Sequence, residues 1–163
     1  NLLSSANTLV NHCRSLSYKI TCAESCTGGI ISAAICSIPG SSKVFEEGFV
    51  LYSNEAKSRS LKINKNLIKK YGAVSEVVAK EMSIKALSVT KSNISIAITG
   101  IAGPEGGTEK KPVGLVFIAI AIHGLVVHIK AYNFKGTRNK IRLDASLRAI
   151  KECTKLLKKK NGN

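Results

Sequence analysis

The alternation of two apolar patterns along the chain is the feature that most constrains its fold. Short apolar runs typical of buried strands occupy residues 19–23, 48–52 and 94–98. Between them, apolar residues recur at intervals of three and four, which predicts amphipathic helices. Strands that alternate with helices favour a sheet covered by helices on both faces, because each crossover must pack against the sheet.

The last third of the chain departs from this alternation. Two longer strand patterns, 113–122 and 125–134, are joined through His123-Gly124, which is a hairpin signal and therefore predicts an antiparallel pair. A helical pattern follows over residues 137–157, and the lysine-rich end beyond it is expected to fray. We predict a single three-layer α/β/α domain over residues 1–163, with a mixed sheet that includes this C-terminal antiparallel hairpin.

Composition narrows the class of partner and the compartment. The chain carries 25 Lys and Arg against 10 Asp and Glu, a formal net charge of +15, which favours anionic ligands. Five cysteines without a C-x-x-C pair suggest neither a disulfide framework nor a zinc motif, and they fit a reducing cytoplasm. The most apolar stretch, 113–127, is too short for a membrane helix, and the N-terminus lacks the features of a secretory signal. We expect a cytoplasmic protein without membrane association.

Three polar segments, 24–29, 52–57 and 99–107, each follow a predicted strand directly. In open α/β sheets, ligands collect outside the carboxyl ends of the strands, so these segments are expected to line one crevice. Their glycines allow a ligand to approach the backbone closely, and the helix that opens near Thr27 offers N–H groups to a phosphate or a developing oxyanion. The sequence therefore predicts one site at this edge of the sheet.

A hydroxyl nucleophile with a lysine base is the chemistry that this site favours. Neither G-x-x-x-x-G-K-[ST] nor G-x-G-x-x-G occurs, and the histidines are scattered, so phosphate-loop, dinucleotide and metal sites are not expected. Ser25 and Lys57 are the candidate pair, with Tyr52 to relay a proton or orient them. A lysine can act as a base only if its pKa is lowered, which requires a partly dry pocket. Cys26 is a weaker candidate nucleophile, because free cysteine is usually a packing residue.

Several separate motifs together resemble one known family, the CinA C-terminal domain family. They occur in order over nearly the whole chain, at residues 23–29 (AESCTGG), 39–42 (PGSS), 48–57 (GFVLYSNEAK), 72–76 (GAVSE), 99–104 (TGIAGP) and 111–114 (KPVG). Enzymes of this family are nicotinamide-nucleotide amidohydrolases. The resemblance implies hydrolysis of the carboxamide of nicotinamide mononucleotide (NMN) to nicotinate mononucleotide and ammonia, within pyridine nucleotide salvage and without a cofactor or metal. In the family this unit occurs alone or behind a second domain.

The resemblance also implies residue roles. Residues matching Ser25, Lys57 and Tyr52 are the nucleophile, the general base and their neighbour, and backbone N–H groups around Cys26 to Gly28 or Gly100 to Ala102 would stabilise the oxyanion. The residues expected to contact the substrate are Glu24, Cys26, Thr27, Gly28, Gly29, Thr99, Gly100, Ile101, Ala102, Gly103, Arg138 and Arg142.

Arg138 and Arg142 are the candidates for seating the 5′-phosphate, because they lie four residues apart on one face of the last predicted helix. The family usually has an acidic residue just before the first arginine, whereas this chain has Thr137. The local hydrogen bonding of that turn is therefore expected to differ from the family pattern.

A non-catalytic nucleotide-binding or nucleic-acid-binding module, associated with competence, is the alternative function. This alternative rests on the net charge of +15, which favours binding of nucleotides or nucleic acids. Nucleic acid is not the favoured partner, because the lysines are spread along the chain and aromatic residues make up only 5% of it, without tryptophan. Homo-oligomers are common for such domains, so we expect a homo-oligomer.

Overall fold

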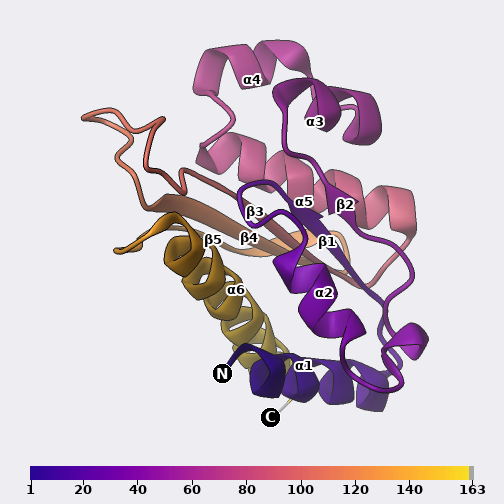
Figure 1. Cartoon of the computed structure of the whole chain (residues 1–163). Helices are drawn as coiled ribbons and strands as arrows, with labels where there is room; N and C mark the ends of the chain where they lie inside the picture. The colour runs from indigo at the N-terminus through magenta and orange to yellow at the C-terminus, as the bar shows by residue number, and fades with distance from the viewer. Residues whose placement is uncertain (162–163) are drawn as a thin grey trace.

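The computed structural model describes residues 1–161 and contains one five-stranded mixed sheet (Figure 1). The strand order is β2-β1-β3-β4-β5. β1 pairs in parallel with β2 and β3, whereas β3, β4 and β5 pair antiparallel in turn. The strands are β1 (Ile20–Glu24), β2 (Phe49–Val50), β3 (Ile94–Gly100), β4 (Leu115–Ile122) and β5 (Leu125–Asn133).

Helices cover both faces of the sheet (Figure 1). One face carries α1, α2 and α6, and the other carries α3, α4 and α5. The helices are α1 (Leu2–Leu16), α2 (Ile30–Cys36), α3 (Asn54–Leu61), α4 (Lys65–Tyr71), α5 (Glu76–Thr90) and α6 (Arg138–Asn161). The arrangement confirms the predicted three-layer α/β/α architecture with its antiparallel hairpin.

β3 shows why the chain needs both helical layers. Ile94, Ile96 and Ile98 are fully buried in the core beneath α1, α2 and α6. Ala97 points to the opposite core, where its small side chain leaves room for α5 against the strand. Ser95 and Thr99 share that face and are also buried, and their hydroxyls donate to the carbonyls of Ser83 and Ala73. The polar residues of β3 therefore do not mark a face in contact with solvent.

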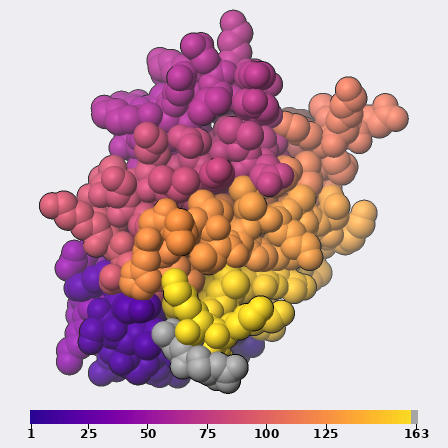
Figure 2. All heavy atoms as spheres, turned by 180° about the vertical axis from the view of Figure 1, so that it is seen from behind, coloured from indigo at the N-terminus to yellow at the C-terminus, as the bar shows by residue number. Residues whose placement is uncertain are grey.

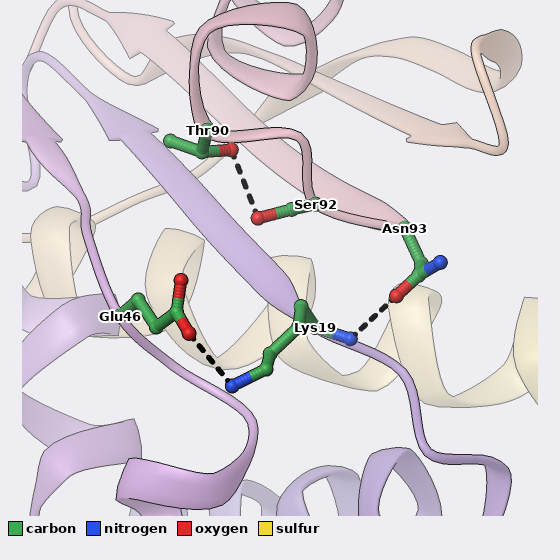
Figure 3. Close-up of polar contacts among 5 residues, drawn as sticks. All are labelled: Lys19, Glu46, Thr90, Ser92 and Asn93. Carbon is green, nitrogen blue, oxygen red and sulfur yellow. Dashed lines mark hydrogen bonds and ion pairs between the residues drawn. The ribbon is translucent and has the colours of Figure 1, made fainter.

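Polar contacts fix the amino-terminal ends of β1 and β3 (Figure 3). The backbone N–H of Lys19 donates to Asn93 Oδ1 at 2.7 Å, while the N–H of Ile94 donates to the Lys19 carbonyl at 3.0 Å. The Lys19 ammonium also pairs with Glu46 at 2.9 Å. These contacts hold the two parallel strands in register, so the polar segments that follow their carboxyl ends emerge side by side.

Several predicted boundaries were wrong by one or two residues: β3 ends at Gly100 rather than 98, and β4 begins at Leu115 rather than 113. Two other differences bear on the path of the chain. β2 is a two-residue strand rather than the five residues 48–52, because only Phe49 and Val50 pair with β1 before the chain turns toward α3. α6 reaches Asn161, so residues 158–161, which were expected to fray, continue the helix, while 162–163 lie outside the described residues. Within residues 1–161, no helix is long and apolar enough to cross a membrane.

Candidate active site

The three polar segments meet, as predicted, at the carboxyl ends of β1 and β3. They enclose a cavity of about 230 Å³. Its lining residues are Ser25, Cys26, Tyr52, Asn54, Lys57, Ala73, Val74, Thr99, Gly100 and Ala102. The fold thus brings together the nucleophile, base and tyrosine candidates that were chosen from the sequence.

Ser25 and Lys57 are in direct contact inside this cavity. The Lys57 Nζ donates to Ser25 Oγ at 3.0 Å and to the Leu51 carbonyl at 2.8 Å. Ser25 is 7% exposed. Lys57 lies near the start of α3, yet its side chain points inward and is only 1% exposed. Burial lowers the pKa of Lys57 from 10.5 to about 8. A substantial fraction of this amine is therefore neutral just above physiological pH and able to accept a proton.

Glu24 does not line the cavity, contrary to the prediction that it contacts the substrate. Its carboxylate is completely buried. The backbone N–H groups of Ile31 and Ser32 donate to it, each at 2.9 Å. The hydroxyls of Thr27 and Ser32 also donate to it, at 2.8 Å and 2.7 Å. Glu24 thereby caps α2 from the preceding strand. The amides that were expected to await an anion at this helix end are already occupied.

Thr27, Gly28 and Gly29 shape the turn and do not line the cavity, so their contact with a substrate stays a prediction. Thr27 is fully buried, and its hydroxyl donates to Glu24. Gly28 and Gly29 have φ values of +60° and +98°, which glycine adopts without strain. A Cβ on Gly28 would lie 3.1 Å from the Arg142 guanidinium, so this glycine also makes room for that side chain.

Arg142 contacts the turn that follows Ser25. Its Nε donates to the Cys26 carbonyl and its Nη2 to the Thr27 carbonyl, both at 3.1 Å, and its Nη1 donates to Asn139 Oδ1 at 3.3 Å. Each guanidinium nitrogen therefore has an acceptor in the protein. Arg142 thus supports the residues that follow Ser25, while its role in phosphate binding stays a prediction, because three bonds leave two of its five N–H groups for another acceptor.

Arg138 lies at the rim of the cavity. Its Nη1 donates to the Gly103 carbonyl at 2.7 Å, and its Nη2 donates to the Tyr52 hydroxyl. Tyr52 lines the cavity yet is 60% exposed. Arg138 is itself exposed, so of the two arginine candidates it is the one positioned beside the opening. Gly103 does not line the cavity but anchors this arginine.

Several backbone N–H groups proposed for an oxyanion hole are already bonded. The N–H of Gly28 donates to the Ser25 carbonyl at 3.0 Å, and that of Ile101 donates to the Leu115 carbonyl at 2.9 Å. Ile101 is also absent from the cavity lining. Within residues 1–161, the N–H of Ala102 has no acceptor in the protein, and Ala102 lines the cavity.

Asn54, Ala73 and Val74 line the cavity but were not predicted from the sequence. Asn54 begins α3 beside Tyr52, a position that the strand-to-helix junction could have indicated. Ala73 and Val74 follow α4 and are held by Thr99, whose hydroxyl donates to the Ala73 carbonyl at 2.9 Å. This contact crosses 26 residues of sequence, and no local pattern encodes it.

Cys26 has the properties of a packing residue. Burial raises the pKa of its thiol to about 12, so the thiolate that would act as a nucleophile is scarce near neutral pH. Within the described part of the chain, no cluster of His, Cys, Asp and Glu side chains could hold a metal ion.

Comparisons with known proteins identify the family of this chain. The family model described as the CinA C-terminal domain matches residues 3–157. CinA-like proteins of Fusobacterium nucleatum and Prochlorococcus marinus are 50% and 54% identical over 141 and 122 residues, which are 86% and 74% of this chain. These matches cover 34% and 28% of the relatives, so the chain spans about a third of their length.

Solved structures match over nearly the whole chain. A CinA superfamily protein from Klebsiella pneumoniae is 30% identical, with a TM-score of 0.93, and the match covers 96% of this chain and 98% of that one. A competence/damage inducible protein from Agrobacterium tumefaciens is 35% identical, with a TM-score of 0.89, and the match covers 95% and 94%. With the family model, the sequence relatives and these structures in agreement, this chain belongs to the CinA C-terminal domain family.

Proposed function

We propose that the cavity hydrolyses the carboxamide of a nicotinamide mononucleotide, giving nicotinate mononucleotide and ammonia in pyridine nucleotide salvage. The observation that carries this proposal is the 3.0 Å contact between the buried Lys57 Nζ and Ser25 Oγ within the cavity. A serine hydroxyl is a weak nucleophile until a base takes its proton. A lysine with its pKa lowered to about 8 supplies that base without histidine.

The reaction proceeds through an acyl-enzyme. Neutral Lys57 accepts the proton of Ser25 as Oγ attacks the amide carbon, and the resulting ammonium then donates a proton to the departing nitrogen, so that ammonia leaves. Lys57, neutral again, activates a water that hydrolyses the ester and restores Ser25. The N–H groups of Cys26 and Ala102 are the proposed donors to the oxyanion, because both residues line the cavity and, among the described residues, neither N–H has an acceptor on another residue.

The dimensions of the site suit the reacting end of this substrate. A cavity of about 230 Å³ is smaller than sites that enclose a whole drug-sized ligand, so it accommodates the nicotinamide ring while ribose and phosphate extend outward. Arg138 lies at that opening and carries a positive charge toward the 5′-phosphate.

The experiment is ammonia release from NMN by the purified chain, by Ser25→Ala and by Lys57→Ala. Lys62→Ala is the control, because Lys62 is an exposed lysine just beyond the same helix. We expect both site variants to lose activity, the control to keep it, and circular dichroism to show all of them folded. Mass spectrometry of the quenched wild type should find Ser25 acylated. Absence of ammonia from wild-type protein that demonstrably binds NMN would exclude the amidohydrolase function.

A further inference from the structure

One row of side chains on β5 lies beyond the helices that cover its face of the sheet. His128, Lys130 and Tyr132 alternate along β5 opposite buried residues of β4, and Phe134 continues the row just past the strand. α6 packs mainly over β3 and β4, so its outward side lies beside this row. The strip between the row and that side of α6 has a hollow at each end, and we call this strip the groove. Figure 2 shows β5, in orange, at the open edge of the sheet next to α6, in yellow.

Aromatic rings form a ladder along the β5 wall of this groove. The ring centroids of His128 and Tyr132 are 6.3 Å apart with planes at 24°, and those of Tyr132 and Phe134 are 5.9 Å apart with planes at 22°. His128 Nε2 and the Tyr132 hydroxyl also share a hydrogen bond of 3.0 Å. The three rings are half-buried, so they are fixed in place while part of each remains accessible.

Cations line the opposite wall. Arg148, Lys151, Lys155 and Lys159 recur every three or four residues along α6. Arg148 and Lys151 line the hollow at one end of the groove and Lys159 lines the other, while Lys151 and Lys155 also border a hollow beside α1. The Arg148 guanidinium carbon lies 5.5 Å from the centre of the Tyr132 ring, and Lys130 Nζ lies 5.6 Å from it.

The carboxylates Asp144 and Glu152 are paired with cations of α6, so the excess positive charge of the groove comes from its lysines. Asp144 pairs with Lys140 at 2.7 Å, and Glu152 pairs with Arg148 at 3.4 Å. Hollows of about 320 Å³ and 280 Å³ lie at its two ends, the first beside Phe134 and Arg148 and the second beside Val127 and Lys159. From residue 144 to residue 160, the α6 axis runs about 24 Å.

We propose that this groove binds single-stranded nucleic acid. The cations of α6 and Lys130 would track the phosphates, while bases pack against the aromatic ladder, the combination that sequence-tolerant single-strand sites use. Paired bases in a duplex present no open face to such rings, so a single strand is favoured over a duplex. A second copy of this chain is disfavoured as occupant, because each copy carries a net charge of +15.

This inference revises the expectation from sequence. Lysines spread along the chain and a 5% aromatic content argued against nucleic acid. The fold, however, places three of the few aromatic rings on one strand and opposes them with one cationic side of a helix. The groove does not use the cavity that contains Ser25, so it is independent of the proposed hydrolysis.

The test separates the groove from the general basicity of the chain. A fluorescently labelled oligo-deoxythymidine is titrated with three proteins: wild type, Arg148→Gln/Lys151→Gln/Lys155→Gln, and Arg59→Gln/Lys69→Gln/Lys80→Gln. The control variant loses one arginine and two lysines, as the groove variant does, but from exposed positions of α3, α4 and α5. Both variants therefore have the same net charge.

We expect the groove variant to lose at least tenfold in affinity, and its plot of log affinity against log salt to become shallower by about 2, which corresponds to three phosphate contacts. The control variant should stay within about twofold of wild type. Equal losses in the two variants would overturn the proposal, because binding would then follow net charge alone.

A second measurement tests the aromatic ladder. Tyr132→Leu should weaken binding to oligo-deoxythymidine about tenfold, whereas Tyr132→Phe should retain it, because stacking needs the ring and not the hydroxyl. Inorganic polyphosphate carries phosphates without bases and should bind Tyr132→Leu as well as wild type. An equal effect of Tyr132→Leu on both probes would overturn base stacking. So would tighter binding to poly-glutamate or to anionic vesicles than to the oligonucleotide, since the groove would then fit another class of partner.

Discussion

Lys57→Met is expected to stabilise the protein at neutral pH while it abolishes the proposed activity. A fall in pKa from 10.5 to about 8 means that folding disfavours the ammonium of Lys57 by about 3 kcal/mol at pH 7. Methionine has a similar unbranched shape and no charge to bury. Against this gain stand the lost hydrogen bonds to Ser25 Oγ and to the Leu51 carbonyl, which together contribute about 2 kcal/mol. A net gain of about 1 kcal/mol at pH 7 remains.

The pH dependence of that difference gives the sharper assay. Between pH 8 and 10.5 the unfolded chain keeps the Lys57 proton while the folded chain has lost it, so wild-type stability rises with pH relative to the methionine variant. The advantage of Lys57→Met should therefore shrink as pH rises and reverse before pH 10. Urea unfolding of both proteins across this range measures it, and the other lysines cancel in the difference. A stability difference that stays constant from pH 7 to 10 would refute the lowered pKa of Lys57.

Three further predictions follow from the same geometry. Ammonia release should rise with pH around an apparent pKa of about 8, since neutral Lys57 is the active form; a profile without a transition near pH 8 would contradict its role as base. Glu24→Gln should lower the free energy of unfolding by about 3 kcal/mol, because the new side-chain NH2 must face one of the α2 amides that now donate to Glu24. The control Glu47→Gln, at an exposed position, should change that free energy by less than about 0.5 kcal/mol. Arg138→Gln should impair hydrolysis of NMN more than hydrolysis of nicotinamide riboside, which lacks the phosphate. Arg142→Gln should impair the two reactions equally, because Arg142 supports the turn that follows Ser25.

The sequence predicted where the site lies better than it predicted how each side chain is used. Polar segments after parallel strands must emerge at one edge of a sheet, so the meeting of Ser25, Tyr52 and Lys57 followed from the strand pattern. The direction of Glu24 did not follow. All residues of β1 are buried, so the usual alternation of apolar and polar residues, which indicates the face to which a side chain points, is missing there.

Contacts that cross long stretches of sequence were the other unpredictable part. Arg142 reaches the Cys26 carbonyl across 116 residues, and its side chain is directed there by the packing of α6 beside α2. From sequence, a pair of arginines near a helix start indicates an anion site equally well. Only the position of the carbonyls after Ser25 distinguishes support of the turn from binding of a phosphate.

The composition of this chain does not indicate that Lys57 differs from its other lysines. In a protein with 25 Lys and Arg, one more lysine on a short helix is by itself unremarkable, and the expected environment of such a residue is solvent. Yet Lys57 is 1% exposed, and burial lowers its pKa to about 8. α3 provides this burial by capping itself with Ser53 and turning Lys57 inward toward Ser25. The abundant surface lysines provide positive charge, whereas the desolvated Lys57 provides a base. The glutamine triple variants remove surface charge without changing Lys57, and Lys57→Met removes the base without changing the surface lysines.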